Sequence, residues 1–142
     1  MLTIDDVQAA RRRIAGAVAV TPCLESTALS DLTGCRVFCK LEYLQRTGSF
    51  KERGACNAMM LLDEAGRRRG VIAASAGNHA LGLAWHGKRL GIPVTVVMPR
   101  YAPLVKSSTC RGFGARVIFF GDVFSEARHR ADEIAAEEGL TL

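Results

Sequence analysis

The sequence predicts an α/β fold, a three-layer sandwich in which helices cover both faces of a parallel sheet. Two observations lead to this prediction. From Gly70 onward, short apolar runs alternate with helical patterns, which is the order of βαβ units. The runs themselves, at Val71–Ala74, Val94–Met98 and residues 117–120, are almost wholly apolar. Such runs are typical of parallel strands that are buried on both faces.

The first 66 residues predict two helices and one strand. Thr3 is a suitable N-cap for a helix that runs to about residue 15 and ends at Gly16. Residues 36–43 alternate in character and predict a strand without an evident partner, followed by a polar loop at 45–48. Ser49 and Glu52 fit a capping box, which predicts a helix that ends at Gly66.

The remaining elements follow the alternating pattern. Gly77 leads into a helix that ends near Gly91, and further helices are predicted at residues 103–111 and 125–138. Residues 139–142 resemble the beginning of another strand. Because the pattern stops there without a closing helix, we expect the chain to be an N-terminal piece of a longer protein.

Composition excludes several classes of protein. The chain has 142 residues, of which 49% are hydrophobic and 23% charged, as in a globular protein. It has no apolar run long enough for a bilayer and no secretory leader, so we expect a cytoplasmic location. The net charge of +5 comes largely from two arginine triplets. No aromatic residues interleave with them, which favours solvated helix faces over a nucleic-acid surface.

The five cysteines are expected to be reduced thiols rather than metal ligands. They are scattered and form no CxxC pair. Cys35 and Cys39 are four residues apart in or beside the predicted strand. Their side chains would then lie roughly 13 Å apart, too far to share one ion. No metal site is therefore expected.

Lys51 is the first candidate for chemistry, because it falls in the first turn of the helix predicted after Ser49. The positive end of the helix dipole disfavours an ammonium group, so we expect a lowered pKa for Lys51. A neutral amine can attack a carbonyl carbon. The alternative is an exposed lysine that extends into water.

The run Ser75-Ala76-Gly77-Asn78-His79 is the second candidate. It joins a buried strand to a helix, where backbone N–H groups and the helix dipole favour a bound anion. An ordinary turn, with Ser75 or Asn78 as the helix cap, is the alternative. For His79, a capping or packing role competes with acid–base chemistry.

Together these segments resemble one family. Residues 40–51, which include Ser49-Phe50-Lys51, are similar to the lysine motif of the fold-type II pyridoxal-phosphate (PLP) enzymes, and residues 75–80 are similar to their substrate-carboxylate loop. The likeness continues through residues 90–93, 97–99, 102–106 and 114–115. Within that group the chain resembles the threonine/serine dehydratase (threonine ammonia-lyase) family, whose small domain has a tryptophan-synthase-β-like fold.

The resemblance implies a role for each candidate residue. Lys51 would carry PLP covalently and remove the α-proton of the substrate. Phe50 would pack near the cofactor ring, and Asn78 would hydrogen-bond its phenolic oxygen. The amino-acid carboxylate would be bound by backbone N–H groups of four residues, namely Ser75, Gly77, Asn78 and His79. The implied reaction turns a β-hydroxy amino acid into a 2-oxo acid and ammonia.

Position 76 favours a dehydratase over the related serine racemases. Racemases of this group have a second serine in the loop as an acid–base group, and here that position is Ala76. The cysteine-synthase branch has a threonine-rich loop that residues 75–79 do not match. A non-catalytic protein that binds a metabolite or a partner remains an alternative. A nucleotide-binding domain is disfavoured, because no GxGxxG or P-loop lysine pattern follows a strand.

The resemblance also predicts what the chain lacks. The glycine-rich loop that holds the cofactor phosphate lies further downstream in relatives, and none of the 14 glycines here are consecutive. Residues 1–50 would belong to the large PLP domain and residues 51–142 to the small domain. We therefore expect this segment alone to be inactive. We also expect a homo-oligomer, because an unpaired strand at 36–43 would leave Val37, Leu41 and Tyr43 exposed.

Overall fold

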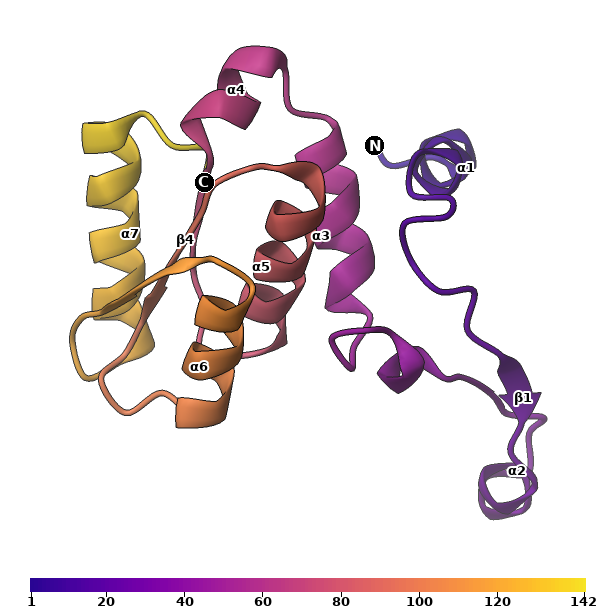
Figure 1. Cartoon of the computed structure of the whole chain (residues 1–142). Coiled ribbons are helices and arrows are strands. Elements are labelled where there is room, and N and C mark those ends of the chain that lie inside the picture. The colour runs from indigo at the N-terminus through magenta and orange to yellow at the C-terminus, as the bar shows by residue number, and fades with distance from the viewer.

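The computed structural model describes residues 1–142 and has a three-stranded parallel sheet at its centre (Figure 1). Its strands are β3 (Val71–Ala74), β4 (Val94–Met98) and β5 (Arg116–Phe119), in the spatial order β3-β4-β5. Val71 pairs with Val94, and Thr95 pairs with Arg116. All three strands lie where the apolar runs predicted them, within a residue at each end.

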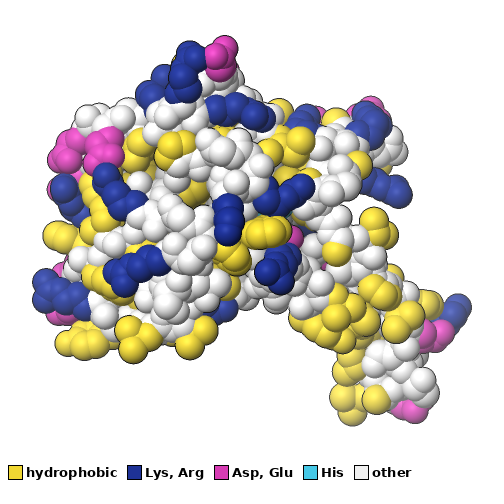
Figure 2. Space-filling view, viewed as in Figure 1, with side chains coloured by type: hydrophobic (Ala, Val, Ile, Leu, Met, Phe, Trp, Pro, Cys, Tyr) yellow, Lys and Arg dark blue, Asp and Glu magenta, His cyan; other side chains and the backbone are white.

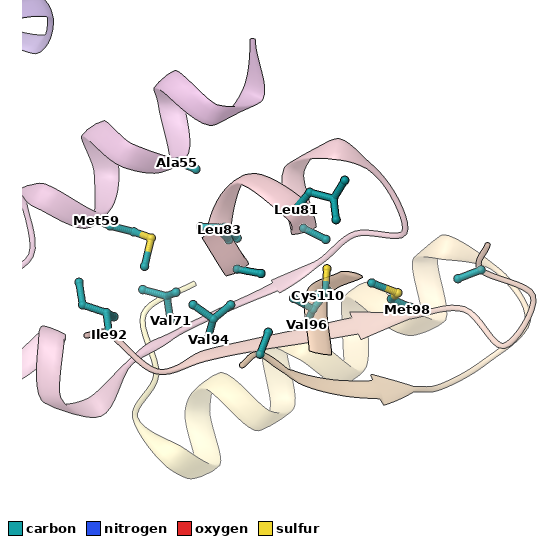
Figure 3. Close-up of a cluster of buried hydrophobic side chains, with 14 residues drawn as sticks. Ala55, Met59, Val71, Leu81, Leu83, Ile92, Val94, Val96, Met98 and Cys110 are labelled. Atoms are coloured by element: carbon teal, nitrogen blue, oxygen red, sulfur yellow. The ribbon is translucent and has the colours of Figure 1, made fainter. Parts of the chain in front are cut away.

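Helices cover both faces of this sheet, as predicted. The face towards α3 (Lys51–Met60), α5 (Asn78–Leu90) and α6 (Leu104–Gly112) holds the larger core (Figure 3). The opposite face packs on α7 (Phe124–Glu138), through Ala127, Ala131 and Ile134. Neighbouring residues of β3 serve different faces: Val71 belongs to the larger core and Ile72 to the smaller one. This alternation is what makes parallel strands apolar throughout.

The helix predicted to end at Gly66 is in fact two helices. α3 ends at Met60, and a short helix, α4 (Glu64–Arg69), begins after Asp63. The Asp63 side chain accepts a hydrogen bond of 2.7 Å from the Gly66 N–H, so Asp63 is an N-cap. Gly66 therefore lies inside α4 rather than at the end of α3, and the sequence-based boundary was wrong.

The N-terminal segment begins with α1 (Ile4–Arg13). Thr3 is its N-cap, as predicted, and forms a capping box with Asp6. A two-stranded antiparallel sheet follows, made of β1 (Cys23–Glu25) and β2 (Phe38–Lys40), with α2 (Thr27–Thr33) between them. The predicted strand at 36–43 is thus only three residues long. It ends at Lys40 because a 3₁₀ helix, η1 (Glu42–Leu44), turns the chain towards α3.

The expectation that this strand lacks a partner was also wrong, since β1 pairs with it throughout. Val37 and Leu41 are half-buried rather than exposed, whereas Tyr43 is exposed. The β1–β2 pair and α2 project from the body of the molecule and carry many exposed apolar side chains (Figures 1 and 2). Among apolar residues of the first 50, Ile14 alone is buried.

Two smaller predictions concern the C-terminal strand and the cysteines. The strand predicted at 139–142 is reduced to one parallel bridge between Thr141 and Val71, on the free edge of β3. All five cysteines are free thiols, of which Cys56 and Cys110 are buried. Burial raises the pKa of both thiols. No helix of this fold combines the length and the apolar character that a membrane span requires.

Candidate active site

Lys51 is the first residue of α3, as the sequence predicted, and its side chain is exposed. Its Nζ atom lies 5.1 Å from the centroid of the Phe50 ring, a distance typical of a cation–π contact. Phe50 is itself 60% exposed. The lysine and the aromatic ring therefore form one accessible surface at the N-terminal end of α3.

The start of α3 is not held by the predicted capping box. Phe50 is the N-cap and makes no side-chain capping bond, while the hydroxyl of Ser49 is buried without a hydrogen-bond partner. Glu52 is 1% exposed and turns to the preceding loop instead. Its Oε2 atom accepts hydrogen bonds from the Thr47 N–H and the Thr47 hydroxyl, both 2.8 Å long. A buried carboxylate with two donors thus fixes the loop that leads into Lys51.

A second set of polar contacts fixes this loop from the other side. Glu42 accepts two hydrogen bonds from the Arg53 guanidinium, at 2.7 and 2.8 Å. The Gln45 amide is 4% exposed and bonds both backbone groups of Ala19. Arg53 is the main reason that the pKa of Glu42 falls to about 2, and the Thr21 hydroxyl contributes although burial opposes the shift. The segment before Lys51 is therefore anchored to α3 and to the linker after α1.

The loop at residues 75–79 joins β3 to α5, as predicted. The Ser75 hydroxyl accepts hydrogen bonds from the N–H groups of Gly77 and Ala80, each 3.3 Å long. The N-cap of α5 is Gly77 rather than Ser75 or Asn78, but the Ser75 hydroxyl binds the first turn of the helix. A Cβ atom at Gly77 would meet nothing within 4 Å, so this loop borders open space. In the first turn of α5 the Ala80 N–H is thus occupied, whereas those of Asn78 and His79 have no partner within the helix.

Asn78 and His79 begin α5 and have different surroundings. The Asn78 side chain is exposed, and its Oδ1 atom accepts a hydrogen bond of 2.7 Å from the Lys106 ammonium. His79 is half-buried and lines an apolar cavity of about 140 Å³ between α3 and β3. Burial lowers the pKa of His79, and the charge of Lys51 lowers it further. Both effects favour the neutral form of His79.

The N-terminal parts of α3 and α5 are neighbours because small residues face each other. A Cβ atom added to Gly82 would lie only 3.4 Å from the Glu52 backbone and from the Ala55 Cβ. The loop before α3 is held to α5 as well, since the Arg46 guanidinium lies 5.4 Å from the Trp85 ring centroid. The effect of Lys51 on His79 agrees with this closeness. Packing thus brings Lys51 and the loop at residues 75–79 to one region.

This arrangement fits PLP as a ligand. It offers an amine that can form a covalent bond, an aromatic side chain beside it, and an exposed amide whose Nδ2 remains a donor. The buried Ser49 hydroxyl lacks a hydrogen-bond partner two residues before Lys51. The cavity of about 140 Å³ is not this site: His79 lines it, but Lys51, Ser75, Gly77 and Asn78 do not.

Two residues of the region did not emerge as candidates from the sequence. Lys106 belongs to a stretch that resembles the family, but its contact with Asn78 joins two residues that are 28 positions apart and lie on different helices. Glu52 was assigned to a capping box. No sequence pattern distinguishes a capping carboxylate from one that is buried against Thr47.

Comparisons with known proteins agree with this site. Residues 14–142 match the sequence family described as pyridoxal-phosphate dependent enzyme. The whole chain aligns with 35% of the L-threonine ammonia-lyase of Thermotoga maritima, with 48% sequence identity. It also aligns with 41% of the catabolic L-threonine dehydratase TdcB of Staphylococcus aureus, with 43% identity. Its fold matches that of maize serine racemase with a TM-score of 0.90 and 34% identity, over 98% of this chain and 42% of the racemase.

The chain spans less than half the length of these curated relatives. The likeness nevertheless extends over all of its 142 residues, and the parallel sheet with its covering helices is that of the fold-type II enzymes. The chain therefore belongs to the family of pyridoxal-phosphate-dependent enzymes.

Proposed function

We propose that the protein containing this chain is a PLP-dependent ammonia-lyase that converts threonine or serine into a 2-oxo acid and ammonia. The observation that carries the proposal is the meeting of two helix N-termini, one bearing Lys51 and the other following Ser75. The 48% identity to a threonine ammonia-lyase over the whole chain supports the same reaction. When bound, PLP supplies the electron sink that stabilises negative charge at the α-carbon.

In this proposal Lys51 has two tasks at one atom. Its Nζ holds the cofactor covalently and later accepts the α-proton of the amino acid. The contacts of Glu52 with Thr47 keep the start of α3 in place, so the backbone of Lys51 is held in a fixed position. Phe50 lies beside Nζ and provides an apolar surface for the ring.

The loop after β3 binds the substrate in this proposal. The carboxylate would lie against Ser75, Gly77, Asn78 and His79, with the positive end of the α5 dipole behind them. The Ser75 N–H already donates to the Val97 carbonyl and the Gly77 N–H to the Ser75 hydroxyl, so the N–H groups of Asn78 and His79 would be the carboxylate donors. The open space at Gly77 admits an anion close to the backbone. The Asn78 amide would donate a hydrogen bond to the phenolic oxygen of the cofactor.

A serine racemase is the second candidate, supported by the fold match to the maize enzyme. The side chain at position 76 favours the lyase. Ala76 packs against the larger core and offers no group that can carry a proton. A racemase needs a second acid–base group on the opposite face of the cofactor, and alanine cannot serve as one.

The proposal extends to the division of the chain. Both apolar cores consist of residues between Ala55 and Ile134, which supports a small domain at 51–142. We assign residues 1–50 to a larger domain. The family resemblance implies that the glycine-rich loop that holds the cofactor phosphate lies in that larger domain rather than in residues 1–142. Residues 1–142 alone should therefore bind PLP weakly and show no turnover.

The full-length protein tests the proposed reaction. L-Threonine and L-serine should yield 2-oxo acid and ammonia, and Lys51→Ala should abolish both products. Lys88→Ala is the matched control, because Lys88 is exposed on α5 and outside the site. Borohydride reduction and peptide mapping should find the pyridoxyl group on Lys51. A label on Lys40 or Lys106 would refute the assignment of the lysine.

A further inference from the structure

The contact between Lys106 and Asn78 has a chemical consequence for the site. The Lys106 ammonium projects from α6 and lies 2.7 Å from Oδ1 of Asn78, the first residue of α5. Lys106 is half-buried, whereas Asn78 is exposed. The half-buried cation thus holds an exposed side chain at the start of α5.

The chemistry of the two groups determines which way the amide is oriented. An ammonium group has three donors and no acceptor, so the amide atom that it contacts must be the oxygen. The Nδ2 group then points away from Lys106 and can only donate. Without the lysine, the amide could turn by half a rotation and present its oxygen instead.

We propose that Lys106 is a positioning residue that orients Asn78 so that the amide N–H, and not the amide oxygen, faces the phenolic oxygen of PLP. This inference rests on the proposed function, because it assumes the cofactor beside Lys51. An ionised phenolic oxygen is an acceptor, so a donor binds it and an amide oxygen repels it. Lys106 acts through Asn78 and does not itself contact the cofactor.

The test compares Lys106→Met, Lys106→Arg, Asn78→Ala and the double variant in the full-length protein. Lys88→Met is the control, since Lys88 is an exposed lysine of α5 that takes no part in the site. Lys106→Met should weaken PLP binding by the apoprotein about tenfold, the equivalent of one hydrogen bond to a charged group. It should also shift the pH titration of the visible absorbance of bound PLP. Lys106→Arg keeps a donor and should restore most of both properties.

The double-mutant cycle shows whether Lys106 acts through Asn78. If it does, Lys106→Met should have no further effect on PLP binding or on the absorbance titration once Asn78 is alanine. Additive losses, or a Lys106→Met protein identical to Lys88→Met, would overturn the inference and leave the proposed function standing. A wild-type protein that binds no PLP would overturn the proposed function itself.

Discussion

Glu42→Gln should destabilise the protein at neutral pH by removing the charge that Arg53 contacts twice. The Glu42 side chain is 15% exposed and that of Arg53 is 33% exposed. The pKa of Glu42 drops from 4.5 to about 2, first because of the Arg53 hydrogen bonds. At roughly 1.4 kcal/mol for each step of one in pKa, this difference corresponds to about 3 kcal/mol. Water screens part of the ion pair, so we expect a loss of about 1–2 kcal/mol.

The pH dependence follows from the direction of this shift. A carboxyl group with a lowered pKa stabilises the fold above its unfolded value of 4.5, and that stabilisation is lost as the pH falls through about 2. The wild type should therefore lose its advantage over Glu42→Gln progressively in acid. Urea unfolding followed by circular dichroism, at a series of pH values from neutral downward, measures the difference.

Glu25→Gln is the matched control for Glu42→Gln. Its partner Arg36 is 76% exposed and Glu25 is 42% exposed, so this ion pair should contribute less than about 0.5 kcal/mol. Equal unfolding free energies for Glu42→Gln and the wild type at neutral pH would refute the reasoning. A difference that stays constant into acid would refute it as well, because the ionisation of Glu42 would then not be the cause.

Four further outcomes are expected. Gly87→Ala should cost about 1–3 kcal/mol in thermal unfolding, because a Cβ would lie 2.3 Å from the Val94 Cγ2, while Gly112→Ala, where a Cβ meets nothing within 4 Å, should be nearly neutral. Thr47→Val removes a donor to a buried carboxylate and should cost about 1–2 kcal/mol in urea unfolding; no loss would mean that Glu52 does not depend on it. In the full-length protein, Ala76→Ser should raise the share of D-serine formed from L-serine, measured by chiral chromatography, and an unchanged share would count against the proton-relay argument. Light scattering of residues 1–142 should give a mass above 15.3 kDa, since apolar side chains are exposed on β1, α2 and β2; a monomer would contradict this.

The part of the fold after Gly70 was predictable because periodicity and burial agree there. Val94–Met98 is buried at every position, and an apolar run of this length between turn residues indicates a central strand. The N-terminal segment offers no such signal. β1 has the sequence Cys-Leu-Glu and is exposed at all three positions, so only its pairing with β2 makes it a strand. Pairing across 15 residues is a tertiary event that local pattern cannot reveal.

The candidate site divides in the same way. Lys51 and Asn78 stand at helix starts that turn residues mark in the sequence, and the family resemblance gave them roles. The orientation of Asn78 depends on Lys106 from a different helix. The position of Glu52 depends on burial, which converts an apparent capping residue into a support for Thr47. These relations exist only once the helices have packed.

The close approach of α3 and α5 at Gly82 has a consequence for engineering this protein. The distance between Lys51 and Asn78 is set by the spacing of two helix axes, because each is the first residue of its helix. A larger side chain at Gly82 or Ala55 would widen that spacing without touching any ligand. Under the proposed function, selectivity for longer amino acids could therefore be sought in the interior contact between the helices, with Lys51 and Asn78 left as they are.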